Sequence, residues 1–164
     1  MTSICNVLTS NVIDLLSAEP NVDAQVQALA EAAGFEIHGH KVSTIVAQNT
    51  PIELAEKSLQ AKYPAIQVYC DKLSNVLKEK FRTFSGKAHL VIEIRCSQDR
   101  LEGIDRKLHV YAEAVCNILD GARGDWGNGA FYAGGYDAVF GPVRHGGQNF
   151  IDIVKIGFEV DISK

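Results

Sequence analysis

Three histidines are the residues best suited by type to do chemistry in this sequence. His38 and His40 stand in the stretch HGH, and His145 precedes two glycines in RHGG. Residues two apart on a strand face the same side, so His38 and His40 could hold a metal ion with a further ligand from elsewhere. An isolated histidine pair is more often solvated or packed incidentally, and His145 is expected in a turn. We therefore predict no metal site.

The sequence offers no recognisable nucleophile. It contains no GxSxG motif and no local Cys–His signature. Its four cysteines are Cys5, Cys70, Cys96 and Cys116, and none is closer than twenty residues to the next, so no CxxC pair exists. Cys96 and Cys116 fall at apolar positions of predicted elements, and we expect both to be reduced core residues. No catalytic residue is predicted.

Residues 120–150 hold nine of the fourteen glycines, which raises the question of a phosphate or cofactor cradle. The segment has neither GK[ST] nor GxGxxG, and aromatic, β-like sequence follows its glycines where a phosphate loop would open a helix. We predict no bound cofactor. The interleaved aromatic residues favour a twisted, exposed hairpin over a disordered linker. Trp126, the single tryptophan, lies in this polar segment, where it is expected to contact a partner.

Hydrophobic periodicity predicts the elements around this segment. Helices are predicted over residues 10–16, 22–33, 51–63 and 99–121, and strands over 35–47 (as one or a pair), 65–70, 87–97 and 149–163. Thr50 and Glu53 have the spacing of a capping box around Pro51. A hairpin is expected around the stretch FSGK, just before the strand 87–97.

Together these elements predict an α+β fold. It has a largely antiparallel sheet, a central amphipathic helix packed on one face, N-terminal helices and a glycine- and aromatic-rich extended hairpin. At 164 residues the chain is expected to be a single domain over 1–164, with 1–50 as a possible N-terminal elaboration.

The formal net charge of −4 and the absence of a Lys/Arg run argue against a sequence-specific DNA-binding protein. The N-terminus has no basic region followed by a long apolar run, so no signal peptide is expected. No stretch reaches the length of a transmembrane helix, and no membrane association is predicted. We expect the protein to be cytoplasmic where it is made.

From YPAIQVYC to the C-terminus the chain resembles the tail-terminator and tail-completion proteins of long-tailed bacteriophages. The stretches that carry the likeness are FRTFSGKAHLVIEIRCS, RLEGIDRKLHVYAEAVCNIL, GDWGNGAFYAGGYD and FIDIVKIGFEV, roughly the last hundred residues. The resemblance implies a non-enzymatic α+β virion subunit, assembled in the host cytoplasm, that needs no cofactor. The resemblance also implies that the subunits form a ring, commonly a hexamer, on the end of the tube built by the tail tube protein. The ring would offer a surface to the head–tail connector protein. DNA passes through the lumen without specific binding, which an acidic balance suits.

In that reading the glycine-rich segment is an assembly hairpin, and six residues are candidates for subunit or tube contacts. They are Arg123, Asp125, Trp126, Phe131, Tyr132 and Arg144. Replacing Trp126 by alanine is expected to spare the fold and impair assembly. Two alternatives stay open. One is a small intracellular enzyme or ligand-binding protein with residues 120–150 as a lid and His38, His40 or His145 as polar groups. The other is a head–tail connector (neck) protein, which would also form a ring.

Overall fold

The computed structural model describes residues 3–37, 41–57, 61–146 and 148–164. Its elements along the chain are α1 (Ile4–Ser17), α2 (Val22–Ala33), β1 (Thr44–Val46), α3 (Ile52–Lys57), β2 (Ala65–Asn75), β3 (Ser85–Gln98), α4 (Ile104–Gly121), β4 (Gly124–Gly127), β5 (Ala130–Tyr132), β6 (Asp137–Phe140), β7 (Arg144–Gly146) and β8 (Asn149–Ser163). The predicted α+β class is confirmed.

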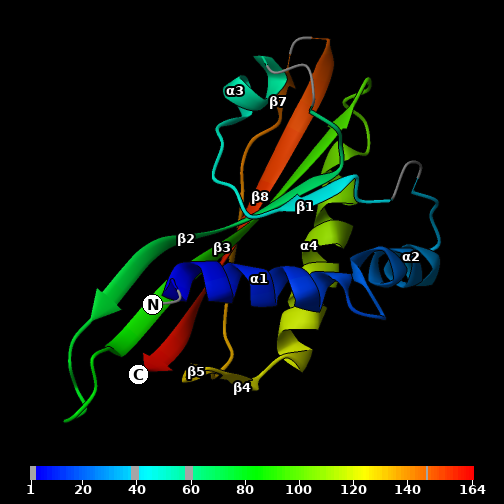
Figure 1. Ribbon diagram of the computed structural model, residues 1–164. Coiled ribbons are helices and arrows are strands. Elements are labelled where there is room, and N and C mark those ends of the chain that lie inside the picture. The colour runs from blue at the N-terminus through cyan, green and yellow to red at the C-terminus, as the bar shows by residue number, and fades with distance from the viewer. Residues whose placement is uncertain (1–2, 38–40, 58–60, 147) are drawn as a thin grey trace.

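The strands form one sheet with the order β1-β2-β3-β8-β5-β4, in which β6 and β7 also pair with β8. All of these pairings are antiparallel except β1 with β2. The long strands β3 and β8 run side by side from Ser85↔Ser163 to Gln98↔Phe150 and form the spine of the sheet (Figure 1).

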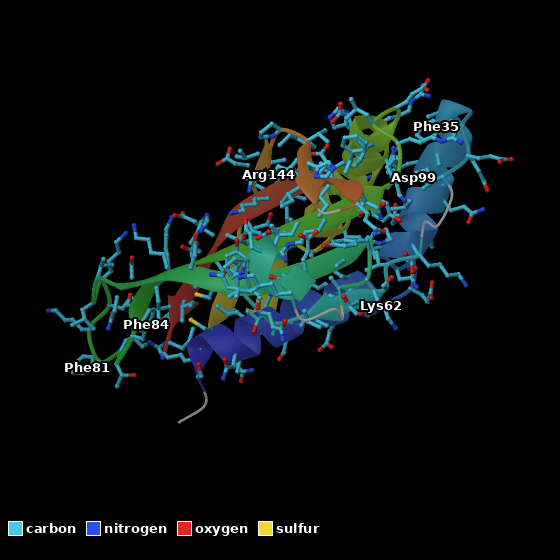
Figure 2. The ribbon with its side chains drawn as sticks, turned by 90° about the horizontal axis from the view of Figure 1, so that it is seen from above. Phe35, Lys62, Phe81, Phe84, Asp99 and Arg144 are labelled. Carbon is cyan, nitrogen blue, oxygen red and sulfur yellow. The ribbon has the colours of Figure 1, made fainter. Side chains whose placement is uncertain are left out.

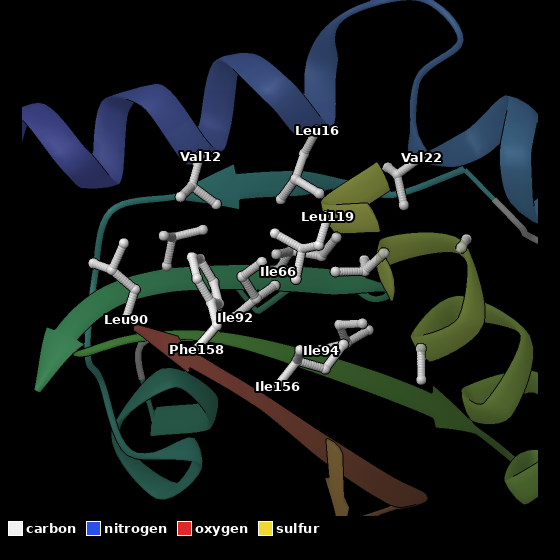
Figure 3. Packing of buried hydrophobic residues seen from close by; sticks show 14 of the residues in the cluster. Val12, Leu16, Val22, Ile66, Leu90, Ile92, Ile94, Leu119, Ile156 and Phe158 are labelled. Carbon is white, nitrogen blue, oxygen red and sulfur yellow. The ribbon is translucent and has the colours of Figure 1, made fainter. Parts of the chain in front are cut away.

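Helices α1 and α4 cover one face of this spine, and α2 packs against α4 (Figure 1). Alternate residues of β3 and β8 are buried on that face, as Figure 3 shows for several of them. They are Ala88, Leu90, Ile92, Ile94 and Cys96 in β3 and Val154, Ile156, Phe158, Val160 and Ile162 in β8. Along α4, Leu108, Tyr111, Val115 and Leu119 are at most 1% exposed and form the expected apolar stripe. The alternate residues of the strands and the apolar stripe of the helix therefore pack together in a single hydrophobic cluster.

The N-terminal helix is longer than predicted. It begins at Ile4, where the Ser3 hydroxyl accepts a hydrogen bond from the Asn6 N–H, and not at residue 10. Leu8, Val12 and Leu16 recur every four residues and are buried against the sheet (Figure 3 labels the last two). The next helix, α2, was predicted correctly, and Gly34 ends it with φ +74°, a left-handed conformation that glycine adopts without strain.

Other boundaries differ from the predictions. Among the described residues of the predicted strand region 35–47, only Thr44–Val46 pairs; His38 and His40 lie outside the described residues. Helix α3 begins at Ile52. The Pro51 carbonyl accepts a hydrogen bond from the Ala55 N–H, so Pro51 occupies the N-cap position and not the first helical one. Helix α4 starts at Ile104 and has no side-chain cap.

Strand β2 continues to Asn75, five residues beyond the predicted end. The predicted hairpin between β2 and β3 is present, but its loop is residues 76–84, before the expected FSGK. Gly86 lies within β3 opposite Asn75, and a Cβ at Gly86 would stand 1.8 Å from the Ser74 carbonyl oxygen. This glycine therefore permits close strand approach and does not make the turn.

The glycine-rich segment 120–150 contains the expected hairpin but is not a free arm. Strands β4 and β5 form a tight hairpin around Asn128 and Gly129, with φ values of +54° and +78°. After it, β5, β6 and β7 each pair with a successive part of β8. The prediction of an exposed, extended hairpin is therefore corrected: beyond β4, the segment lies along one edge of the sheet.

Candidate assembly surface

The six predicted contact residues do not form one site. Arg123, Asp125, Trp126, Phe131 and Tyr132 lie on or beside β4 and β5, whereas Arg144 lies on β7. These strands are at opposite ends of the molecule (Figure 1). The separation follows from the pairing of β5 and β7 with opposite ends of β8.

Trp126 and Tyr132 belong largely to the core. The Trp126 Nε1–H donates to the Ala122 carbonyl at 2.8 Å, and the indole ring lies 5.4 Å from the Tyr132 ring and 6.2 Å from the Phe158 ring. Tyr132 is 0% exposed, and its hydroxyl donates to the Gly135 carbonyl. The expected surface contact by Tyr132 is therefore corrected. Half-buried Trp126 keeps one accessible edge, but its replacement by alanine is now expected to cost about 2–4 kcal/mol of stability.

The other four candidates are accessible. Arg123 pairs with Asp120 at 3.5 Å, and the exposed Asp125 carboxylate accepts the Gly127 N–H at 2.8 Å. Phe131 is 49% exposed on β5. Arg144 is exposed on β7, at the far end. Their roles in subunit or tube contacts remain predictions.

A hollow lies between the C-terminal half of α1 and β4. We call it the α1–β4 hollow; its volume is about 370 Å³ and its lining residues are Asn11, Asp14, Leu15, Ala18, Asp125 and Trp126. Its lining combines two carboxylates with the side chains of Leu15, Ala18 and Trp126 and includes no cationic residue. An apolar hollow bordered by one sign of charge is suited to a partner of the opposite charge.

The sequence predictions missed a second surface, the loop between β2 and β3. Residues 76–84, here called the β2–β3 arm, project from the sheet, and Phe81 stands at the tip (Figure 2). Phe81 is 104% exposed, Leu77 61% and Val76 55%. The signal was present in VLKEKFRTF, whose apolar residues precede a strand without belonging to its alternation.

No protein-family model matches the chain, and no curated protein sequence does. Among solved structures, a chain described as "Virion of native gene transfer agent (GTA) particle" is similar, with a TM-score of 0.52 and 13% sequence identity. The alignment covers 96% of this chain and 95% of that chain. At this identity the likeness establishes a shared fold. It extends well beyond the last hundred residues, so the N-terminal region shares in it.

The opposite face of the sheet carries a buried polar cluster. Arg95 Nη2 lies 2.9 Å from Glu93 Oε1 and donates to the Thr50 carbonyl, and the Tyr69 hydroxyl donates to Glu93 Oε2 at 3.1 Å. Burial and the Glu93 carboxylate raise the pKa of Tyr69. A hollow of about 450 Å³ adjoins the cluster, but Glu93 and Arg95 satisfy each other and anchor residue 50 to β3. These buried charges are paired and hold residue 50 against β3.

The structure also bears on the alternative in which residues 120–150 act as a lid over a binding site. Residues 130–131, 137–140 and 144–146 are paired with β8, so they cannot close over a site as a lid without breaking sheet hydrogen bonds. His145 lies on β7, with its ring 6.0 Å from the Phe150 ring. Among the described residues, no group of three or more His, Cys, Asp or Glu side chains could hold a metal ion. None of the described helices is long and apolar enough to span a membrane.

Proposed function

We propose that this protein is a structural subunit of a phage-like virion that forms a ring on the end of the tail tube and terminates its polymerisation. The observation that carries the proposal is the fold similarity over 96% of the chain to a chain of a gene transfer agent virion. The resemblance of the last hundred residues to tail terminators gives the proposal its specific role. Neither argument requires a catalytic site or a cofactor.

Two separate surfaces suit a ring subunit. A closed ring is built from head-to-tail contacts in which one patch of each subunit meets a different patch of its neighbour. The β2–β3 arm and the α1–β4 hollow are two such patches. In the proposed assembly, commonly a hexamer, one side of the ring meets the tail tube protein and the other meets the head–tail connector, while DNA passes through the lumen.

The test is native mass measurement and negative-stain imaging of the purified protein, alone and mixed with tail tubes. Closed rings, or tubes capped at one end, are the expected result, and the mass gives the number of subunits. A monomer that leaves tubes uncapped would overturn the proposal.

The same images separate a terminator from a connector. Rings that bind the head vertex and ignore the tube would assign the protein to the neck. Capping by a protein that is monomeric in solution would still support the terminator role, with the ring forming on its template.

A further inference from the structure

The β2–β3 arm is an ordered projection. The Asn75 side chain accepts the Leu77 and Ser85 N–H groups and donates to the Thr83 carbonyl. The Lys164 carbonyl accepts the N–H groups of Thr83 and Phe84 at 2.7 and 2.9 Å. The base of the arm is thus tied to β2 and to the end of β8, so the tip keeps its direction.

The tip has two energetically unfavourable features, positive φ angles at bulky residues and a fully exposed aromatic ring. Burial of the ring against a partner would offset their cost. Leu77 and Phe81 have φ values of +47° and +65°, which are uncommon for bulky residues. Phe81 also leaves its whole ring in water. Exposed apolar side chains on a strained backbone are typical of segments that contact a partner.

The charges of the arm and of the α1–β4 hollow are complementary. The arm carries Lys78, Lys80 and Arg82 and one acid, Glu79, which lies 3.5 Å from Arg82. This cationic tip belongs to a chain whose net charge is −4. The hollow supplies the carboxylates of Asp14 and Asp125 around the apolar surface of Trp126. The arm thus offers an aromatic tip flanked by cations, and the hollow offers an apolar surface flanked by carboxylates, which is a matched pair of surfaces.

The arm is placed away from the hollow of its own copy. The Cys5 and Cys70 sulfurs lie 2.9 Å apart, so the first turn of α1 rests on β2 and the arm continues past that end of the helix. The hollow is lined by the other half of α1 and by β4. Figure 1 shows β2 leading toward the arm beyond the N-terminal end of α1. An arm that enters this hollow must therefore come from another copy of the chain.

We propose that the β2–β3 arm of each copy binds in the α1–β4 hollow of the next copy, with Phe81 as the apolar anchor and the lysines against Asp14 and Asp125. The occupant of the hollow is thus a second copy of this chain. Each subunit gives one arm and receives one, and successive contacts form a closed ring when the rotation between neighbours returns to the first copy. This inference rests on the proposed function and names its subunit contact.

Three variants and a control test the contact: Phe81→Ser in the arm, Asp14→Lys in the hollow, the double variant K80E/D14K, and Leu101→Ser. Leu101 is 58% exposed and belongs to neither surface, so it controls for the loss of an exposed apolar side chain. The readouts are native mass at several concentrations, tube capping and a thermal melt. All altered side chains are exposed, so the melts are expected to match that of the wild type.

Phe81→Ser is expected to weaken self-association at least about 30-fold, as for truncation of an interface hot spot. Asp14→Lys is expected to weaken it as well, and K80E/D14K to recover part of the loss because the charges are exchanged. Leu101→Ser is expected to associate like the wild type.

Rings that form equally well with Phe81→Ser and with Asp14→Lys would overturn the arm-to-hollow contact and leave the proposed function standing. A loss in Phe81→Ser alone, with the mass of Asp14→Lys unchanged, would also overturn it and place the arm on a different partner such as the tube. A wild-type chain that neither self-associates nor caps tubes would overturn the proposed function as well.

Discussion

Asp152 is a buried carboxyl group at the junction of β8 and α4. It is 2% exposed, and its Oδ1 accepts the Ile153 N–H at 3.0 Å. Burial, with a hydrogen bond to Asp105, raises its pKa from 3.8 to about 6, and nearby His109 acts in the opposite direction. The folded protein therefore holds a proton here that the unfolded chain releases at lower pH.

Replacing Asp152 by asparagine is expected to stabilise the protein above pH 6 by about 1–2 kcal/mol. In the wild type, the stability associated with the bound proton is full below pH 3.8 and is lost as pH rises through about 6. The asparagine does not ionise and can still accept the Ile153 N–H.

Urea unfolding of both proteins between pH 4 and pH 8 measures the difference. The difference in the free energy of unfolding between the variant and the wild type should grow as pH rises from 4 to 7 and then stay constant. Equal pH profiles, or a variant less stable than the wild type at pH 8, would contradict the assignment.

The Cys5 and Cys70 thiols, 2.9 Å apart, are expected to form a disulfide on treatment with oxidised glutathione. Two thiols lose two protons and two electrons, and one oxidised glutathione becomes two reduced molecules. Burial raises the pKa of Cys70 to about 12, so little of the Cys70 thiol is ionised at neutral pH. Because the thiolate is the reactive form, the reaction should accelerate as pH rises.

Non-reducing electrophoresis and a thermal melt follow this reaction. The crosslinked chain should melt at a higher temperature because the disulfide restricts the unfolded state. Cys5→Ser should abolish the mobility change, and a change that persists in Cys5→Ser would show that other cysteines react.

Among the elements, the β4–β5 hairpin depends on two residues with positive φ. Asn128 and Gly129 form the two-residue turn, and Asn-Gly is the preferred pair for this geometry. A Cβ at Gly129 would stand 2.1 Å from the Ser163 carbonyl oxygen, which itself belongs to β8.

Gly129→Ala is therefore expected to destabilise the protein by about 2 kcal/mol or more, through strain and the clash with β8. Asn128→Gly is the matched control, since glycine adopts its φ easily, and should change stability by less than about 0.5 kcal/mol. Chemical denaturation compares the two. Similar losses in both would mean that the turn itself, and not its contact with β8, limits stability.

Elements with strong local patterns were predictable from sequence, and those defined by distant pairing were not. The alternation of β3 and β8 and the stripe of α4 gave both their type and their buried faces. Residues 35–47 have β-branched composition, but among those that the structure describes only Thr44–Val46 pairs with another strand. The edge pairing of residues 130–146 depends on β8, which local composition does not reveal. Tyr132 was mistaken for a surface residue for the same reason.

At the scale of the whole molecule, opposite charges on two surfaces make assembly sensitive to salt. If the arm and the hollow bind each other, raising NaCl from about 0.05 M to about 0.5 M should reduce the associated fraction, because the screening length falls below about 10 Å. Native mass or light scattering at each salt concentration measures this. The folded core is apolar, so the urea midpoint should change little, and association that strengthens with salt would point to a purely apolar contact.

The short outer strands of the sheet have a consequence for how the protein stays separate from its neighbours. Strands β1, β4, β6 and β7 are three or four residues long, and the edge of β8 is covered in three interrupted pieces. A long bare strand would recruit another chain by main-chain hydrogen bonding. Among the described strands, a longer bare edge remains on β2, whose residues 68–75 pair with β3 on one side and extend beyond the three-residue β1 on the other. Strand addition is thus disfavoured at the short strands β1, β4, β6 and β7, and would have to start on β2 beyond its pairing with β1.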